Sequence, residues 1–429
     1  MQKPKPGYKL VKSLFGKYEE IPEYWEYEKL SNMVTKSISY GVLVPDNDPN
    51  GIPMIRSGEL DFEGGIERNL QKISPKLEDK FAKTRLQGGE ILVSLVGYTG
   101  QVTLVSPNYA GYNVSRAIGV VNLKKDYNNK FYYYCLKSNS MQRKILYDSI
   151  GSAQAVINLD RLRKLTIIVP SKKEQHKIAD ILSNMDELIN HYDRVIGSTK
   201  LLKQGLMQQL LTKGIGHKKF KKVKWFFGKF LSIPDEWNLS SMEKISETLS
   251  SGGTPSTTIL EYWNGAIPWT RGAVLTKHYL DCGERFITKK GLENSSSVII
   301  PKENLLVASR VSVGNLAVNL IDIAINQDVT GIVVDKSQIS TDFLYWYLVQ
   351  NIGILVSYSQ GTTIQGFTRK ELAKFLILLP DLHEQKTIAL ILTNIDTKIF
   401  DLESKKYSLE KLKKGLMQKL LTGQLRVAA

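Results

Sequence analysis

The chain has 429 residues and a formal net charge of +16 at pH 7, because 58 Lys and Arg residues outnumber 42 Asp and Glu residues. This length suffices for two or three domains with their own cores, and a hydrophobic fraction of 42% excludes a disordered chain. Two cysteines cannot build a disulfide framework, and no apolar stretch has the length of a signal-peptide core or a membrane span. We therefore expect a protein of the reducing cytoplasm that has no membrane partner.

The first part of the chain has the pattern of a domain that mixes strands and helices. Short β-branched runs bounded by Gly, Asn and Pro predict strands at residues 91–96, 102–105, 117–123 and 165–169. An apolar run at residues 131–136 predicts a short helix within the same domain. We expect an α+β domain of about 150 residues.

The same order of elements returns in the second part of the chain. Strands are predicted at residues 297–300, 305–309, 331–334 and 376–379, and a helix at residues 343–349. Each domain is followed by a long helical segment, which begins after Pro170 in the first part and after Pro380 in the second. Gly214 and Gly423 mark the ends of these segments.

Both long segments carry a seven-residue apolar repeat. In the first segment it comprises Ile178, Met185, Tyr192, Thr199 and Leu206, with Ile181, Leu188, Val195 and Leu202 three residues later, broadened by Leu182, Ile189 and Ile196. In the second it comprises Ile388, Ile395, Leu402, Leu409 and Leu416, flanked by Ile391, Leu392, Ile399 and Leu412. Such a repeat over four to five heptads is typical of a coiled coil. Two helices docked on separate cores are the alternative, but matched length and register favour a pair.

The chain is an internal repeat with near-identical ends and dissimilar middles. Residues 21–25 (IPEYW) return as 233–237 (IPDEW), and residues 205–212 (GLMQQLLT) return as 415–422 (GLMQKLLT). Between these ends the copies diverge, and residues 112–115 align only loosely with residues 325–328. One scaffold with two different recognition domains explains this pattern. Because the copies are related by a pseudo-two-fold repeat within one chain, we expect the long helices to pair antiparallel.

Catalytic motifs are absent from the sequence. The five histidines lie far apart without a CxxC or HExxH context, and no phosphate-binding GxxxxGK[ST] loop occurs. Residues 252–255 (GGTP) form only a turn signal, and residues 48–50 (DPN) differ from the tetrad that amino-methyltransferases use. We therefore expect no metal site, no cofactor site and no catalytic residue in this chain.

One segment resembles a metal-nuclease signature. Pro380 and Asp381 are followed by Glu384 and Lys386, but the two carboxylates would have to meet across a hairpin to hold Mg²⁺. Both lie at the start of the long helix, and the first copy has lost Asp and Lys at the matching positions. We favour acidic residues that interact with the helix dipole.

Loops in the two middles contain side chains of the types that read DNA bases. Arg hydrogen-bonds guanine, and Asn or Gln hydrogen-bonds adenine. The candidates in the first copy are Arg56, Ser57, Tyr98, Thr99, Gln101, Asn113, Ser115, Arg116, Ser152 and Gln154. Those in the second copy are Thr254, Arg271, Arg310, Ser312, Asn326, Gln327, Thr362, Thr363, Gln365 and Arg369. A solvated loop residue is the alternative for each one alone, whereas matching positions in both copies favour a function for the set.

The positive charge favours a polyanionic partner, because each neutralised phosphate releases condensed counterions. The basic segments at residues 3–17 and 213–229 are candidates for phosphate contact, above all Lys221 and Lys222. Alternatively these lysines form the solvated face of an alternating strand. A lysine-rich protein without a nucleic-acid role remains open, whereas an anionic membrane is disfavoured because no basic amphipathic helix carries Trp and Phe on its apolar face.

The order of these motifs resembles the specificity subunit of type I restriction–modification enzymes. A segment such as residues 220–237 precedes a variable domain, which is followed by LPxxxEQxxIA at residues 379–389 and GLMQxLLTG at residues 415–423. The resemblance covers almost the whole chain twice. The first copy departs slightly, with Val169 before Pro170 in place of Leu and with Lys213 before Gly214 in place of Gly-Gln.

The resemblance implies that each variable domain reads one half of a split, asymmetric site in double-stranded DNA. It also implies that the paired helices act as a spacer and dock two modification subunits, which would bring S-adenosylmethionine and methylate adenine N6. Two restriction subunits would add translocation and cleavage that depend on ATP and Mg²⁺. The implied fold is two α/β target-recognition domains joined by an antiparallel coiled coil, and the chain itself would be non-catalytic.

The expected boundaries follow from these motifs. Residues 1–170 would be the first recognition domain, 171–214 the first long helix, 215–380 the second recognition domain with a basic linker at 215–232, and 381–425 the second long helix. Two alternatives from other classes remain, a coiled-coil scaffold without a DNA role and a nuclease or methyltransferase that acts alone.

Overall fold

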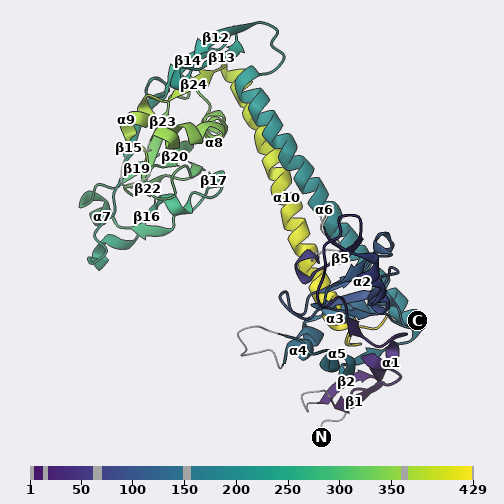
Figure 1. Ribbon diagram of the computed structural model, residues 1–429. Helices are drawn as coiled ribbons and strands as arrows, with labels where there is room; N and C mark the ends of the chain where they lie inside the picture. Colours follow the sequence, from purple (N-terminus) through teal and green to yellow (C-terminus); the bar gives the residue numbers. More distant parts are fainter. Residues whose placement is uncertain (1–3, 13–17, 61–69, 148–155, 359–365, 428–429) are drawn as a thin grey trace. The chain divides into compact units, whose positions relative to one another are not determined.

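The computed structural model describes residues 4–12, 18–60, 70–147, 156–358 and 366–427. The chain forms two compact units, the first made of residues 1–193 and 404–429 and the second of residues 194–403. Each unit contains one mixed domain and a stretch of both long helices (Figure 1). No described helix combines the length and apolar character that crossing a membrane requires.

The first unit is built mainly from short strands. In chain order its elements outside the long helices are β1 (Tyr8–Lys12), β2 (Tyr18–Pro22), β3 (Glu26–Lys29), α1 (Leu30–Met33), β4 (Ser39–Tyr40), β5 (Ile52–Ile55), β6 (Gln71–Ile73), α2 (Pro75–Asp79), β7 (Ile91–Ser94), β8 (Val102–Leu104), β9 (Asn113–Val114), β10 (Ile118–Val121), α3 (Asn129–Lys137), α4 (Asn139–Leu146), α5 (Leu159–Lys164) and β11 (Thr166–Val169). Strands β4, β10, β7 and β8 form an antiparallel sheet, and β6, β5 and β9 form a mixed one. The four strands and the helix predicted for this part are confirmed as β7, β8, β10, β11 and α3.

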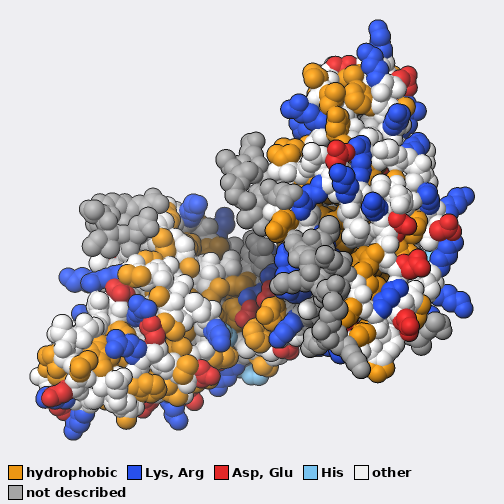
Figure 2. Space-filling view, turned by 90° about the horizontal axis from the view of Figure 1, so that it is seen from below, with side chains coloured by type: hydrophobic (Ala, Val, Ile, Leu, Met, Phe, Trp, Pro, Cys, Tyr) orange, Lys and Arg blue, Asp and Glu red, His pale blue; other side chains and the backbone are white. Residues whose placement is uncertain are grey.

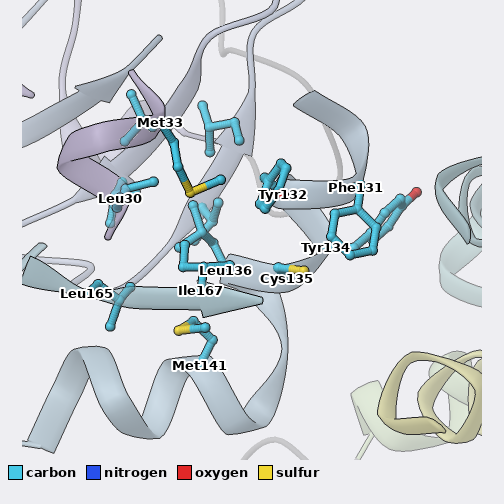
Figure 3. Packing of buried hydrophobic residues seen from close by; sticks show 14 of the residues in the cluster. Leu30, Met33, Phe131, Tyr132, Tyr134, Cys135, Leu136, Met141, Leu165 and Ile167 are labelled. Atoms are coloured by element: carbon cyan, nitrogen blue, oxygen red, sulfur yellow. The ribbon is translucent and has the colours of Figure 1, made fainter. Parts of the chain in front are cut away.

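The main core of the first unit lies where α3 packs against the strands. Figure 3 shows Met33 of α1, Leu136 of α3 and Ile167 of β11 close together, and all three are fully buried. Phe131 and Tyr132 extend the same cluster. Burial of such apolar side chains stabilises the fold by about 1.5–3 kcal/mol per residue. This core fixes the orientation of α3 relative to the sheet.

The second unit repeats this plan with longer strands. In chain order its elements outside the long helices are β12 (Phe220–Lys224), β13 (Phe230–Pro234), β14 (Asn238–Ser241), β15 (Ser246–Ser251), β16 (Trp263–Thr270), β17 (Tyr279–Leu280), β18 (Arg285–Ile287), α7 (Lys289–Glu293), β19 (Val298–Ile300), β20 (Asn304–Ala308), β21 (Leu316–Asn319), β22 (Ile323–Ile325), β23 (Val329–Val334), α8 (Thr341–Tyr358), α9 (Arg369–Ala373) and β24 (Leu376–Leu379). One sheet has the order β15-β23-β20-β21-β17 and another the order β18-β16-β22-β19. The predicted strands are confirmed as β19, β20, β23 and β24, and the predicted helix lies within the longer α8.

The long helices are α6 (Lys172–Lys213) and α10 (Leu382–Leu420), and each begins two residues after its proline. Their cross-helix ion pairs show an antiparallel arrangement. In the first unit Lys413 pairs with Asp186 and Lys406 with Asp193, so the residue number rises on one helix as it falls on the other. In the second unit Lys203 pairs with Asp396 in the same sense. The predicted antiparallel coiled coil is confirmed.

The first predicted heptad series lies in the seam, but the second seam series is one position further along the helix than predicted. Ile189 and Ile399 are each only 7% exposed, whereas Leu188 is 40% exposed and Leu202 is 55% exposed. The buried positions of α6 are therefore those assigned to the broadening stripe, together with the half-buried series that contains Met185. Apolar residues occupy two adjacent helical faces, so counting them could not decide which face meets the partner helix.

Three lysines explain why the true register was hard to see. Lys203, Lys406 and Lys413 occupy the same heptad series as Ile189 and Ile399, where an apolar residue is expected. Each buries its methylene stem along the partner helix, and its ammonium group reaches an aspartate across the seam. A polar residue at such a position fixes the alignment of two helices.

Candidate nucleic-acid interface

The two units share one arrangement of strand ends. In the first unit β5 lies parallel to β9, so that Arg56 and Ser115 follow from neighbouring strands, and the Ser115 N–H donates to the Ile55 carbonyl at 2.9 Å. In the second unit β16 lies parallel to β22, and the Asn326 N–H donates to the Thr270 carbonyl at 3.0 Å. The same backbone contact therefore recurs at the same place in each copy.

This contact corrects the alignment of the middles. The loose resemblance of residues 112–115 to residues 325–328 would align Ser115 with Asp328. The strand pairing instead makes Ser115 equivalent to Asn326 and Arg116 equivalent to Gln327, which shifts the alignment by two residues. The connections between the strands differ in length in the two copies, and sequence comparison alone could not place the gap.

A turn follows the central strand in each copy. The Gly100 N–H donates to the Ser94 carbonyl at 2.8 Å, and the Gly314 N–H donates to the Ala308 carbonyl at 3.0 Å. Both glycines have φ near +90°, a conformation that favours glycine. Tyr98 and Ser312 therefore occupy equivalent positions in the two turns.

A fourth segment joins each group of loops by a close backbone approach. A Cβ on Gly41 would lie 1.8 Å from the Val114 carbonyl oxygen, and a Cβ on Gly252 would lie 1.9 Å from the Ile325 carbonyl oxygen. Only glycine fits at either position. From the sequence Gly252 was predicted only to belong to a turn, and no sequence pattern marked Gly41.

The loops of each unit therefore form one surface. We call residues 41–44, 56–60, 95–101 and 115–117 the first loop cluster, and residues 252–254, 271–274, 309–315 and 326–328 the second loop cluster. In the first, a Cβ on Gly58 would lie 3.3 Å from the Tyr98 ring. In the second, a Cβ on Gly272 would lie 2.9 Å from the Val311 carbonyl oxygen. Each cluster combines segments that are far apart in the sequence.

Comparison with known proteins identifies the family. A family model described as the type I restriction modification DNA specificity domain matches residues 22–194 and again residues 234–411, more than half of the chain. The chain belongs to this family. It is a specificity subunit, the component of a type I restriction–modification system that recognises DNA and works with the other subunits of the system. Because specificity subunits are non-catalytic components of these complexes, the chain is not itself an enzyme.

Individual relatives agree with the family model. The specificity subunit is 28% identical over 422 residues, 95% of each chain, to a Methanocaldococcus jannaschii protein named as the MjaX type I restriction enzyme specificity subunit. It is 26% identical over 200 residues to the EcoBI specificity subunit of Escherichia coli, which covers 45% of this chain and 41% of that one. The crystal structure of the S subunit from M. genitalium matches 92% of this chain and 96% of its own, with a TM-score of 0.59 at 16% identity. The fold is therefore that of S subunits.

Several predicted base-reading side chains of the specificity subunit are engaged within the protein. Arg56 donates to Glu59 at 2.9 Å, and Arg271 donates to Glu284 at 2.7 Å. Hydrogen bonding to these carboxylates raises the pKa of both guanidinium groups above the usual range. The other engaged candidates are Gln101 with the Leu60 carbonyl, Asn113 with Thr84 and Glu78, Asn326 with Asp328, Gln327 with Thr254, Ser115 with the Ala117 N–H, and Arg369 with the Leu249 carbonyl.

Other candidates are available to a ligand. Tyr98, Arg116, Arg310 and Ser312 are exposed, and within the described part of the chain no side-chain hydrogen bond or ion pair holds any of them. Ser57 is half-buried beside Tyr98, whereas the half-buried Thr99 donates its hydroxyl to the Gly97 carbonyl at 3.5 Å and is engaged within the protein. Arg56 and Arg271 are exposed as well but are held by carboxylates, so the unpaired Tyr98, Arg116, Arg310 and Ser312 are the stronger candidates. The remaining candidates, Ser152, Gln154, Thr362, Thr363 and Gln365, lie outside the described residues.

Two lysines predicted to meet phosphate lie on a hairpin of β12 and β13. Lys221 is half-buried and donates to the Asp235 carbonyl, whereas Lys222 is exposed on the opposite face of the strand. The alternation that suggested a solvated strand face is therefore present, and it leaves Lys222 as the more accessible cation. Figure 2 shows Lys and Arg side chains spread over the visible surface.

Sequence reasoning missed apolar members of the first loop cluster. Leu43 and Val44 are exposed, at 46% and 76%, and the Arg116 N–H donates to the neighbouring Val42 carbonyl at 2.8 Å. No sequence pattern singled out these two residues, and only the contact with residues 114–116 shows their place. Within the described residues, no group of three or more His, Cys, Asp or Glu side chains could hold a metal ion.

Proposed function

We propose that each loop cluster reads one half of a split, asymmetric site in double-stranded DNA. The observation that carries this proposal is that the two clusters share backbone hydrogen bonds but not side chains. Tyr98 corresponds to Ser312, and Arg116 corresponds to Gln327. Different donors and acceptors on one backbone frame suit two different base sequences.

The available side chains suggest how each half is read. Arg310 and Arg116 can each donate two hydrogen bonds to guanine, a contact that discriminates by about 1–3 kcal/mol. Leu43 and Val44 can contact a thymine methyl group beside Arg116. Gln327 is held by Thr254 at 2.7 Å, which orients its amide group for adenine. Lys222 contacts phosphate in this proposal and supplies affinity without sequence preference.

The paired helices set the length of the unread spacer in this proposal and dock two modification subunits. Support for the docking comes from exposed residues that the copies share. Leu202 and Leu412 are 55% and 53% exposed at equivalent positions, and a Cβ on Gly205 or Gly415 would meet no atom within 4 Å. Exposed apolar residues that recur in both copies suit one kind of partner that binds twice.

The partners supply the chemistry in this proposal. Two modification subunits bring S-adenosylmethionine and methylate adenine N6, and two restriction subunits add ATP- and Mg²⁺-dependent cleavage in the cytoplasm. A Leu202→Asp or Leu412→Asp substitution is expected to leave one modification subunit bound, and the double variant none, as mass measurement of the purified complex would show. Gln204→Asp is the matched control, because this exposed neighbour lies off the apolar strip.

The reading of bases can be tested in the complex with modification subunits. We expect Arg310→Ala to abolish discrimination at one base pair of the second half-site while the first half-site is read normally. Arg116→Ala is expected to do the reverse. Competition binding against duplexes substituted at each position measures both effects. Equal loss of discrimination in both halves by either variant contradicts the proposal, and binding without any sequence preference favours a scaffold.

A further inference from the structure

The first unit contains a basic cleft of about 1270 Å³ that no function described above uses. It lies among α3, α4, the hairpin of β1 and β2, and the C-terminal part of α10, all within one unit. Its cationic side chains are Lys5, Lys137, Arg143, Lys144, Lys413, Lys414 and Lys419. Among the described residues of the lining only Glu20, Asp186 and Glu410 oppose them, which leaves a surplus of positive charge there.

The acidic residues of the cleft already have cationic partners. Glu20 pairs with Lys5 at 3.8 Å, Asp186 pairs with Lys413, and Glu410 pairs with Lys406 of the same helix at 3.6 Å. The exposed cations Arg143, Lys414 and Lys419 have no carboxylate partner within the described part of the chain. Arg143 donates only its Nε, to the Asn139 carbonyl at 3.3 Å, so the charge of all three side chains is left to balance an external anion.

The walls of the cleft strengthen its electrostatic potential. Ile21, Tyr27, Met141 and Met417 are among its apolar lining residues. The side chain of Lys144 is buried, with its ammonium 6.0 Å from the centre of the Tyr27 ring. A low-dielectric wall reduces the screening of nearby charges and raises the local concentration of anions.

Helix α4 connects this cleft to the first loop cluster. On one side, a Cβ on Gly100 would lie 2.7 Å from the Gln142 amide oxygen and 3.3 Å from a Leu146 methyl carbon. On another side, Asn139 and Arg143 line the cleft. The helix has eight residues and is therefore about 12 Å long. Duplex DNA carries a charge about every 1.7 Å along its axis, so its phosphates extend over such a distance.

We propose that this cleft binds backbone phosphates of the DNA that flank the base pairs read by the first loop cluster. The proposal rests on the proposed function, because it needs DNA at that cluster. An acidic partner protein is disfavoured by the internal repeat. The positions in α6 equivalent to Lys414 and Lys419 are Gln204 and Gln209, so a modification subunit that docks alike on both copies would meet these cations on only one.

The test uses the complex of the specificity subunit with its modification subunits. The variant replaces Arg143, Lys414 and Lys419 with alanine, and the control replaces Lys386, Lys398 and Lys405, which are exposed and line no part of the cleft. Each lost phosphate contact lowers the slope of log affinity against log salt by about 0.9. We expect the variant to lose about 2–3 units of slope, with an unchanged methylation sequence and no such change in the control.

Neutral methylphosphonate linkages locate the contact on the DNA. Placed around the first half-site, these linkages are expected to weaken DNA binding by the complex with the unsubstituted specificity subunit but not by the complex with the triple variant. Placed around the second half-site, they are expected to weaken both complexes alike. An unchanged salt slope in the triple variant overturns the proposal. It is also overturned if methylphosphonates at the first half-site weaken the variant and the unsubstituted complex equally.

Two further outcomes would assign the cleft to a different ligand. Loss of a modification subunit from the triple variant would show an acidic protein partner. Saturable binding of inorganic phosphate that the variant loses, with an unchanged DNA slope, would show a site for a free anion. Both results overturn the proposal. Absence of sequence-specific binding by the unmodified complex would instead contradict the proposed function.

Discussion

Each unit contains one buried glutamate at the start of a long helix, and this single residue connects several parts of the unit. Glu174 accepts the indole N–H of Trp25 at 3.2 Å and pairs with Arg426 at 2.8 Å. Glu384 accepts the indole N–H of Trp237 at 2.9 Å in the second copy. Glu384 also accepts the Ile215 N–H at 2.8 Å, so each carboxylate links the segment before a strand, the start of one long helix and the residues that follow the other.

Removing such a carboxylate should destabilise the protein strongly. We expect Glu174→Ala to lower the free energy of unfolding by about 1.5–3 kcal/mol, because a buried indole N–H and a guanidinium group lose a charged acceptor. Chemical denaturation of the purified protein measures the change. Glu187→Ala on the exposed face of α6 is the control and should have little effect. Equal stability of both variants would show that the Glu174 contacts are energetically neutral.

At the residue scale the sequence predicted types of side chain better than their roles. Arg56 and Arg271 had the right chemistry for reading guanine, but carboxylates hold both. Glu284 is thirteen residues from Arg271 and reaches it only because β16 and β18 pair, so no local pattern could reveal the contact. Arg116 and Arg310 were equally ordinary in the sequence, and they differ from the first two only in having no carboxylate partner within the described part of the chain.

At the element scale the predictions succeeded where hydrophobic periodicity is strong. Helices α6 and α10 and strands such as β7 and β20 appear close to their expected places, because heptad repeats and continuous apolar runs reflect burial directly. The two-residue strands β4 and β9 are too short to carry such a signal. The second seam series was misplaced by one residue because lysines occupy three of its positions.

The corrected register makes a direct prediction about neighbouring residues of α6. Ile189→Asp should destabilise the protein by about 2–5 kcal/mol from lost apolar burial, and the buried carboxylate adds to this effect. Leu188→Asp should have a much smaller effect, because Leu188 is largely on the outside of the pair. Thermal unfolding of the two variants compares them. A larger loss of stability in Leu188→Asp than in Ile189→Asp would show that Leu188, and not Ile189, lies in the seam.

At the scale of the whole molecule, the repeat gives one scaffold two different sets of loop side chains. Family membership and the antiparallel helices were predictable because the two copies preserve the same exposed and buried residues at their ends. The equivalence of the loop clusters was not predictable, because it depends on backbone hydrogen bonds such as that from Gly314 to Ala308. In the proposed function, the length of the unread spacer between the two half-sites should then depend on the number of residues in the long helices.

This dependence predicts the effect of lengthening both helices. Inserting one heptad after Lys200 and another after Lys398 adds about 10.5 Å to the pair and preserves its seam. We expect the unread spacer to lengthen by about three base pairs, since base pairs are spaced by about 3.4 Å. Mapping of methylated adenines reads the spacer directly. An unchanged spacer would show that the helices do not set its length.

The independence of the two loop clusters is tested most directly by exchanging one of them. Residues 26–150 are replaced with the equivalent segment of a relative that has a different target, and methylated adenines are mapped across the genome of cells that express the complex. We predict that one half of the methylated site changes to that of the relative, while the other half and the spacer stay the same. A change in both halves together would contradict two independent reading surfaces and require a single composite one.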